Sequence, residues 1–539
     1  MKRGQITKLF KKEQKGAGVM DKHEYQKRYE LNRRQFLKMA GIGGAAVAAF
    51  PATNFLPRNW AYAQAVGKNA EERAINGALS LAKKAKKKEV TVMIPSGSEG
   101  GFAPYLPEWE KATGIKTNMI TVPMSEIVTK CMNEAVTKSG TYDVMLPNPY
   151  GLPDLAESKL AMDLTDYVKK YNPELTGPNG VIKPIYLYGN LYKGRVYGLL
   201  TDGDINTWII RRDWLNDERN KEAFEKKYGY PLKKPVLFSE VWDQMKFFSD
   251  PSKPRYGGWL GMSPYYAKWE FLEIFTSFGI LPFDNEMRPG IAGKEGIQAL
   301  KELIDVKQTL HPGHTTGGWS EQYKAYAEGT TWTTVSWPSF IKYNNNPKFS
   351  KAAGKMEYCQ APGRKLKDGT IFRPARFTFG WSYIVSRYSK IPELAYCWAQ
   401  YMYSPTVSGK IVRTEGTFFD AFRYNHFKDP KVGQFYDKDR WKELLKVWMI
   451  NAENSYPEIV LRGGEEYNNR LDENVIAAYQ GQKSVEDALN DTAEQWEKIT
   501  RRYGRKRQIE QWTYLISCMG DNFRNVMNLP DPPDWINKI

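Results

Sequence analysis

Three short runs rich in β-branched residues lie close together in the first third of the chain: Glu89–Ile94 (EVTVMI), Lys116–Val122 (KTNMITV) and Tyr142–Leu146 (YDVML). Each run has the length and composition of a strand. Helical stretches separate the runs. The first stretch, residues 103–113, ends at Gly114, which is suited to cap a helix, and Ser125 is the expected N-cap of the second. Strands that alternate with helices predict a parallel sheet covered on both faces, so the expected fold class is α/β.

Polar loops follow the first and third of these strands. In parallel sheets, ligands bind beyond the carboxyl ends of the strands. The candidate ligand-binding side chains in these loops are Ser96, Ser98, Glu99, Asn148 and Tyr150. The first loop, residues 95–101 (PSGSEGG), matches neither GxxxxGK[ST] nor GxGxxG. It therefore predicts a turn that donates hydrogen bonds to hydroxyl groups rather than a phosphate-binding loop.

The whole chain has 539 residues and a net charge of +17. This length exceeds the usual size of one hydrophobic core and predicts at least two lobes. Residues 1–63 contain 13 Lys or Arg and 4 Asp or Glu, so they hold +9 of the total, and the other 476 residues hold only +8. Because no nucleic-acid-binding motif accompanies this mild charge, we expect no nucleic-acid partner.

The amino-terminal segment has the organisation of an export signal. Residues 32–38 (NRRQFLK) resemble the twin-arginine motif, a mildly apolar run follows at 39–50, and residues 61–63 (AYA) have the form of a cleavage site. The apolar run is shorter than the roughly 20 residues that a membrane span needs. We therefore expect a signal peptide that is cleaved near Ala63, leaving a periplasmic protein that does not span the membrane.

Cysteine and histidine give no sign of a metal or catalytic site. The four cysteines lack metal-ligand spacing, and the sequence leaves open whether they form disulfides or stay as buried thiols: Cys131, Cys359, Cys397 and Cys518. Residues 311–314 (HPGH) are expected to form a turn. We therefore expect neither a cofactor nor a bound metal.

Seven motifs follow one another along the chain. They are 108–116 (EWEKATGIK), 140–144 (GTYDV), 194–204 (GRVYGLLTDGD), 209–214 (IIRRDW), 326–338 (YAEGTTWTTVSWP), 379–386 (FGWSYIVS) and 481–489 (GQKSVEDAL). In this order they resemble the extracellular solute-binding proteins of ABC importers, family 1, the carbohydrate-binding cluster that includes the maltose-binding protein. Tyr142 departs from the proline that is usual in the second motif.

The resemblance implies a two-lobed periplasmic binding protein fold, type II-like. Each lobe would be a mostly parallel sheet flanked by helices, and the chain would cross between the lobes at hinges. Carried onto this chain, lobe one takes residues 66–203 and 331–388, and lobe two takes residues 205–330 and 389–539. Residues 503–539 extend beyond the last family-like helix.

The family binds its ligand between the lobes, so the resemblance adds candidates there. Asp202 and Asp204 lie in a crossing segment where the family often has a carboxylate. Gly380 comes just before one candidate ring residue, and Arg462 replaces a small or apolar residue in a late loop, which suggests an acidic or phosphorylated sugar. Aromatic rings complement the C–H faces of sugars. The candidate ring residues are Tyr265, Tyr266, Trp319, Trp337, Trp381 and Tyr467.

The expected function is the solute-binding component of an ABC importer, a monomer that binds a carbohydrate or polyol by hinge closure and delivers it to a membrane permease. Delivery to a chemoreceptor stays open. The alternative is an exported glycoside hydrolase or lyase, which needs two carboxylates about 5–10 Å apart across a sugar bond. Glu99 and Asp204 are the pair that the sequence offers, but no hydrolase motif surrounds them, so we expect no enzymatic activity.

Overall fold

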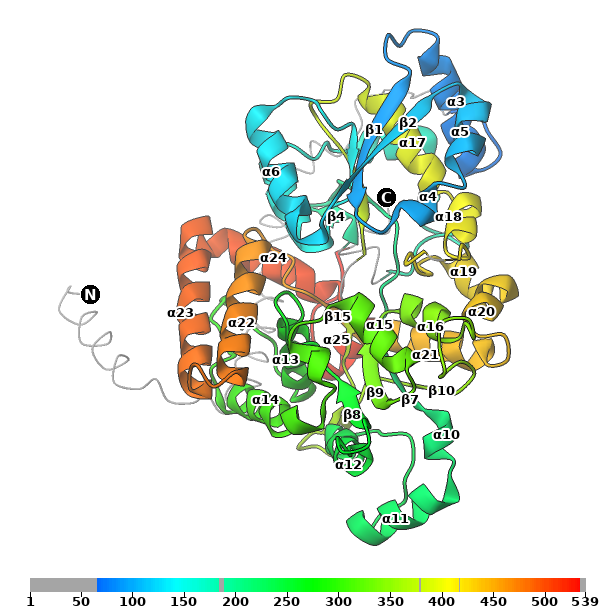
Figure 1. Cartoon of the computed structure of the whole chain (residues 1–539). Coiled ribbons are helices and arrows are strands. Elements are labelled where there is room, and N and C mark those ends of the chain that lie inside the picture. Colours follow the sequence, from blue (N-terminus) through cyan, green and yellow to red (C-terminus); the bar gives the residue numbers. More distant parts are fainter. Residues whose placement is uncertain (1–64, 184–188, 378–379, 416, 534–539) are drawn as a thin grey trace, which may run out of the picture.

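The computed structural model describes residues 65–183, 189–377, 380–415 and 417–533 (Figure 1). Two lobes lie one above the other in this view, each built on a β-sheet with helices packed around it. This arrangement confirms the two-lobed α/β fold. The predicted export signal and its cleavage site near Ala63 lie outside the described residues. Within the described ranges, none of the helices combines the length and the apolar character that a bilayer crossing demands.

The first lobe contains a five-stranded sheet in the order β2-β1-β3-β14-β6. Its strands are β1 (Glu89–Pro95), β2 (Lys116–Val122), β3 (Val144–Met145), β6 (Leu199–Leu200) and β14 (Ser382–Val385). The first three are parallel, as the sequence predicts, but β14 is antiparallel to β3 and β6. It is antiparallel because the chain returns from the other lobe just before β14 and enters the sheet from the side of the cleft. Four of the five strands therefore run in one direction and only β14 runs against them, so the sheet is mixed but mostly parallel, as expected.

Helices pack around this sheet, and α17 contacts both α3 and several strands. The helices and minor strands of the first lobe are α3 (Ala70–Ala82), α4 (Glu99–Phe102), α5 (Leu106–Thr113), η2 (Met124–Glu126), α6 (Ile127–Thr137), η3 (Pro149–Gly151), α7 (Leu152–Glu157), α8 (Thr165–Tyr171), β4 (Leu191–Tyr192), β5 (Arg195–Val196), α17 (Pro392–Tyr403) and α18 (Pro405–Ile411). Gly114 caps α5 with φ +71°, as predicted. Because the turn η2 comes first, α6 begins at Ile127 rather than directly after Ser125.

The second lobe contains a four-stranded sheet in the order β10-β7-β9-β8. Its strands are β7 (Thr207–Arg211), β8 (Tyr256–Trp259), β9 (Thr331–Ser336) and β10 (Met356–Cys359). β7 is antiparallel to both of its neighbours, while β8 and β9 are parallel. β7 starts at the hinge and runs away from the cleft, so β8, β9 and β10 all run towards it. This sheet is also mixed.

The remaining elements surround the second sheet or extend from it (Figure 1). They are α10 (Arg212–Leu215), α11 (Glu218–Tyr228), α12 (Phe238–Phe248), α13 (Ala267–Ser277), α14 (Lys294–Asp305), η4 (Lys307–Thr309), η5 (Pro312–Thr315), α15 (Trp319–Ala327), α16 (Pro338–Asn344), β11 (Arg364–Lys365), β12 (Ile371–Phe372), β13 (Ala375–Phe377), α19 (Tyr424–Lys428), α20 (Pro430–Tyr436), α21 (Trp441–Glu453), β15 (Ser455–Pro457), α22 (Gly464–Tyr479), α23 (Val485–Tyr503), α24 (Arg505–Ser517) and α25 (Asp521–Met527). The turn η5 lies where the sequence predicts one.

The division of the chain between the lobes differs from the expected one. Residues 331–388 were expected in lobe one, but β9 and β10 pair with the two sides of β7 in the second sheet. Residues 389–539 were expected in lobe two, but α17 and α18 pack on α3 of the first lobe. The reason is that the second return of the chain falls between β13 and β14, about 45 residues later than the motif order suggests.

Within the described residues, the chain passes between the lobes near 201–206, between β13 and β14, and near 412–423. The first and last of these crossings touch. A Cβ atom on Gly203 would lie 1.9 Å from the carbonyl oxygen of Ala421, so only glycine fits at this point of contact. The two crossings therefore form a close-packed hinge.

The carboxyl-terminal extension packs on the second lobe. Gln508 and Gln511 of α24 hydrogen-bond the backbone of Arg462, and Phe523 of α25 packs against Phe372 and Tyr456. The extension thus supports the loop that precedes α22. The four cysteines are buried and unpaired, which decides between the two states that the sequence leaves open.

Candidate ligand-binding site

A pocket lies where the two lobes meet. It is lined by residues of both lobes and of the crossings: Met124, Asp202, Asp204, Tyr265, Tyr266, Trp319, Tyr323, Trp337, Ser339, Trp381 and Phe418. Its free volume is about 40 Å³, whereas pockets for small molecules usually hold about 300–1,000 Å³. The lobes are thus closed on each other, and a ligand the size of a sugar needs them to move apart.

The strands place these side chains at the cleft. Asp202 and Asp204 follow β6, and Trp337 follows β9 and forms the N-cap position of α16. Trp381 lies directly before β14, at the point where the chain enters the first sheet. Because strands of both sheets run towards the cleft, residues far apart in the sequence meet at one pocket.

Tyr265 has a backbone conformation that is unusual for a bulky residue, with φ +83°. The Asp472 carboxylate holds this turn by accepting hydrogen bonds from the backbone N–H groups of Tyr265 and Lys268, the latter at 3.0 Å. Residues with such φ values cluster at functional sites, where the surrounding structure enforces them. The strained turn directs two adjacent tyrosines, Tyr265 and Tyr266, into the pocket lining.

The aromatic rings support one another edge to face. The centroids of Trp269 and Trp337 are 5.7 Å apart at 84°, and those of Tyr266 and Trp269 are 5.5 Å apart at 88°. On the other side, Trp319 packs 5.9 Å from Phe418 in a tilted arrangement. The T-shaped packing of the first two pairs fixes ring orientation, so the rings present defined faces to a ligand.

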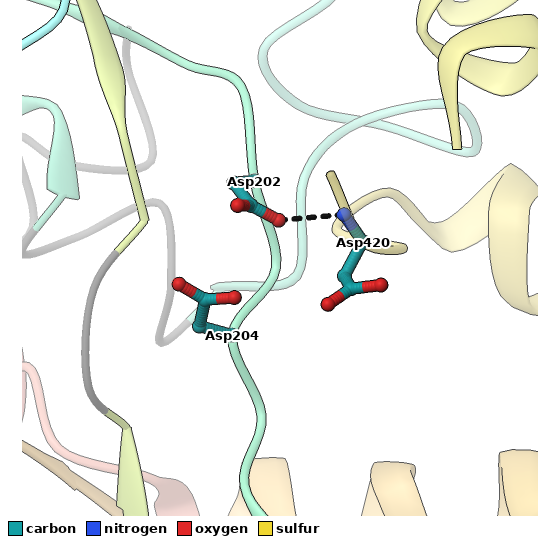
Figure 2. A group of neighbouring side chains, drawn as sticks. All are labelled: Asp202, Asp204 and Asp420. Carbon is teal, nitrogen blue, oxygen red and sulfur yellow. Dashed lines mark hydrogen bonds between the residues drawn. The ribbon is translucent and has the colours of Figure 1, made fainter. Parts of the chain in front are cut away.

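Three buried aspartates lie together at the hinge (Figure 2). Carboxylate oxygens of Asp202, Asp204 and Asp420 all lie within 4.8 Å of one another, and none of these residues is more than 4% exposed. Asp202 accepts hydrogen bonds from the backbone N–H groups of Gly203 at 2.8 Å and Asp420 at 2.6 Å. The cluster therefore joins the first crossing to the last.

Burial and mutual repulsion disfavour the ionised form of these groups. Burial raises the pKa of Asp202 and of Asp204 well above the usual carboxyl value, and the neighbouring carboxylates raise both further. Burial also raises the pKa of Asp420, but the ammonium group of Lys342, 3.1 Å from the Asp420 carboxylate, opposes that rise. Asp420 is further held by the N–H of Ser339 at 2.8 Å and the hydroxyl of Tyr436 at 2.7 Å. One cation thus compensates one of the three acids.

The structure brings seven of the predicted site residues together around the pocket: Asp202, Asp204, Tyr265, Tyr266, Trp319, Trp337 and Trp381. It places the residues of the strand-end loops elsewhere. Ser96 is exposed, the Ser98 hydroxyl donates to the carbonyl of Pro95 at 2.5 Å, and Glu99 begins α4. Asn148 and Tyr150 are each 2% exposed and do not line the pocket.

Three other predicted residues also lie outside the pocket lining. Tyr467 is fully buried, and its hydroxyl contacts Thr500 at 2.8 Å and Gln508 at 3.0 Å, so it is a core residue of the second lobe. A Cβ atom on Gly380 would lie 2.6 Å from Leu200, so this glycine lets the crossing pack closely.

Arg462 binds the opposite lobe instead of facing the pocket. Its guanidinium lies 3.6 Å from Glu157 and 4.0 Å from Asp154, and the adjacent N–H of Gly463 donates to both oxygens of Asp154 at 2.9 and 3.0 Å. The arginine therefore contributes to contact between the lobes. It gives no support to an acidic or phosphorylated ligand.

Four lining residues were not predicted: Met124, Tyr323, Ser339 and Phe418. Ser339 follows Trp337 and Pro338, so the strand-end rule could have indicated it. Tyr323 lies on α15, one helical turn beyond Trp319, and this spacing could also have been used. Met124 and Phe418 carry no comparable local signal.

Comparison with known proteins places the chain among binding proteins. Residues 96–408 match the family model described as bacterial extracellular solute-binding protein. No curated protein is a detectable sequence relative of the chain.

Solved structures share the fold at low sequence identity. A solute-binding protein from Agrobacterium radiobacter K84, in complex with ribitol, is 19% identical with a TM-score of 0.65, covering 76% of this chain and 98% of its own. One from Agrobacterium vitis S4, with bound D-mannitol, is 18% identical with a TM-score of 0.62, covering 77% and 99%. The maltose-bound MalE3 of T. maritima is 20% identical with a TM-score of 0.63, covering 76% and 99%. At these identities the likeness establishes the fold.

Proposed function

The chain belongs to the bacterial extracellular solute-binding proteins, and from this premise we propose that it binds a carbohydrate or polyol and delivers it to an ABC importer. The observation that carries the proposal is the pocket itself. Oriented aromatic rings and buried carboxylates from both lobes converge on one cavity at the hinge. Rings complement the C–H faces of a sugar or polyol, and carboxylates accept hydrogen bonds from its hydroxyl groups.

The lobes act as the moving parts. The pocket is almost filled when the lobes are closed, so ligand enters an open form and closure completes its contacts. The membrane partner in this scheme is the permease of an ABC importer, which recognises the closed form of the binding protein. The protein acts as a monomer in the periplasm after removal of residues 1–63.

The structural neighbours are consistent with a neutral hydroxylated ligand. Ribitol, D-mannitol and maltose are the molecules bound to those proteins. The alternative of a glycoside hydrolase or lyase has less support, because the family is one of binding proteins and Glu99 does not lie with Asp204 in the pocket lining.

The direct test measures ligand-dependent stabilisation of the chain without residues 1–63. A ligand that binds only the folded state raises the unfolding temperature with its concentration. We expect at least one sugar or polyol from a broad panel to produce a saturable rise. A panel without any such rise, or release of product from a bound oligosaccharide, would contradict the proposal.

Two tryptophan variants test whether the ligand binds in the pocket. Replacing the pocket residue by alanine (Trp337→Ala) should weaken binding about tenfold or more, because a stacking ring contributes roughly 1 kcal/mol beyond its buried area. Trp441→Ala removes a half-buried tryptophan of the same lobe that packs on Gly433. This control should leave the affinity unchanged. Equal losses in both variants would place the ligand elsewhere.

A further inference from the structure

The pocket has an excess of negative groups. Among the described residues, Lys342 is the one cation that pairs with any of the three aspartates, and it lies 3.1 Å from Oδ1 of Asp420. Glu458 adds a further negative charge close enough to raise the pKa of Asp204. Arg462, the cation expected from the sequence, binds Asp154 and Glu157 instead.

Asp204 stands apart from the other two acids. Asp420 and Asp202 each accept hydrogen bonds from backbone N–H groups, whereas no described residue donates one to the Asp204 carboxylate. The side chain lines the pocket and Asp204 is only 4% exposed. A buried carboxylate without a donor costs several kcal/mol in its charged form. The carboxylate of Asp204 can therefore accept hydrogen bonds from a ligand in the pocket.

The surroundings of Asp204 favour a cation over other partners. Rings of tyrosine, tryptophan and phenylalanine form most of the lining, and the faces of such rings attract a positive charge. A bare hard metal ion is a poorer fit, because it takes about six to eight oxygen ligands, and the ring faces offer none. An anionic sugar would find no free cation among the described lining residues, because Lys342 is already paired with Asp420.

We propose that the ligand is a hydroxylated amine, an amino sugar or an amino polyol, whose protonated nitrogen sits against Asp204 and Asp202 among the rings. This inference rests on the proposed function and specifies its substrate class. The hydroxyl groups of such a ligand form the hydrogen bonds that any sugar or polyol forms. Its ammonium group supplies the positive charge and the N–H donors that Asp204 lacks.

Binding of an ammonium group should release protons. Burial and mutual repulsion favour the protonated form of Asp202 and Asp204 when the pocket is empty. A bound cation favours the ionised form, so the carboxyl protons leave as the ligand enters. The other titratable groups that face the two acids are Asp420, Lys342, Glu458 and the hydroxyls of Tyr323, Tyr383 and Tyr436. Burial raises the pKa of all three tyrosines well above the usual value, so they stay neutral.

The test compares matched ligands by calorimetry and thermal shift. The pairs are D-glucose with D-glucosamine, and D-sorbitol with N-methyl-D-glucamine; D-glucuronate and calcium chloride alone complete the set. We expect the amine of at least one pair to bind about tenfold or more tightly than its neutral partner. Its binding enthalpy should depend on the ionisation enthalpy of the buffer, because protons are released.

Two variants assign the preference to a residue. Asp204→Asn should bring the affinity for the amine down to that of the neutral partner and should reduce the dependence on buffer to the part that Asp202 contributes. Glu473→Gln removes an exposed carboxylate of α22 that pairs with Arg470, and it should change neither. The unfolding temperature of each ligand-free variant shows that it is folded.

The outcomes separate the two proposals. Neutral members that bind as tightly as the amines would overturn the amine inference and leave the sugar or polyol function standing. Binding of glucuronate, or a calcium response in place of an amine response, would also overturn it. Failure of every neutral and amine member to bind would contradict both proposals.

Discussion

The backbone N–H of Asp420 donates a hydrogen bond of 2.6 Å to Oδ1 of Asp202, and this bond joins the last crossing between the lobes to the first. Both residues belong to the carboxylate cluster that borders the pocket. A ligand that changes the charge of this cluster therefore acts directly on the hinge. Recognition and lobe movement share the same few residues.

Gly203 should tolerate no side chain. A Cβ atom there would lie 1.9 Å from the backbone oxygen of Ala421, and the two crossings cannot separate without breaking the bond from Asp420 to Asp202. We expect Gly203→Ala to lower the free energy of unfolding by about 1–3 kcal/mol, measured by chemical denaturation. Gly100→Ala is the matched control, since a Cβ there meets nothing within 4 Å. Equal stability of the two variants would refute the close contact.

The ligand-free protein should lose stability as pH rises. The pKa values of Asp202 and Asp204 are raised in the folded state, so the folded state holds protons that the unfolded state releases from about pH 4 upwards. Their contribution is complete below that pH and is lost as pH rises through the folded pKa values. Asp204→Asn should flatten this decline and raise the unfolding temperature at neutral pH. A variant with the same pH profile as the parent would show that Asp204 is not the source.

The contributions of Lys342 and Asp420 to the free energy of unfolding should depend on each other. Both side chains are buried, at 8% and 0% exposure, and the charged atoms lie 3.1 Å apart. Removing one partner of a buried pair leaves an uncompensated charge, so Lys342→Met should cost about 3–5 kcal/mol of unfolding free energy. Adding Asp420→Asn should recover part of that loss. A double variant whose loss equals the sum of the single losses would show that the pair is not coupled.

The contact of Arg462 with the first lobe should favour the closed form. Arg462→Gln removes a guanidinium that lies 3.6 Å from Glu157 and 4.0 Å from Asp154. We expect a larger radius of gyration for the ligand-free variant in small-angle X-ray scattering and only a few-fold loss of ligand affinity. A loss of affinity confined to acidic sugars, with no change in size, would instead place Arg462 on the ligand.

Asp154 should make the stability of the folded protein sensitive to pH. Burial raises its pKa to about 6, against the opposing effects of the Gly463 N–H and Arg462. Its contribution to the free energy of unfolding is therefore complete below about pH 4 and is lost as pH rises through about 6. Asp154→Asn should remove that step from the dependence of the free energy of unfolding on pH. Persistence of the step in the variant would assign it to another group.

The sequence predicts best those features that depend on neighbouring residues. The boundaries of β2, the cap at Gly114 and the cleft position of Trp337 all follow from local pattern or from one short motif. Asp202 and Asp204 follow from the resemblance, because they lie in a crossing segment where the family often has a carboxylate.

Features that depend on distant partners were not predictable. The pairing of β9 with β7 joins residues more than 120 positions apart, and nothing in the run TWTTVS states which sheet it enters. The residue type and loop position of Arg462 suggest a ligand contact, but its partners Asp154 and Glu157 lie some 300 residues earlier in the sequence. Phe418 reaches the pocket only because the last crossing returns there.

The interleaving of the lobes also sets the order in which the protein can fold. The first sheet needs β14, and the hydroxyl of Ser389 reaches back across 246 residues to hydrogen-bond Asp143 at 2.6 Å. A growing chain therefore carries β1, β2 and β3 through about 240 further residues of synthesis before the strand β14, which completes their sheet, is made. Contacts of such long sequence separation are slow to form. The protein should reach its native state only after nearly the whole chain is available, with both lobes completed together.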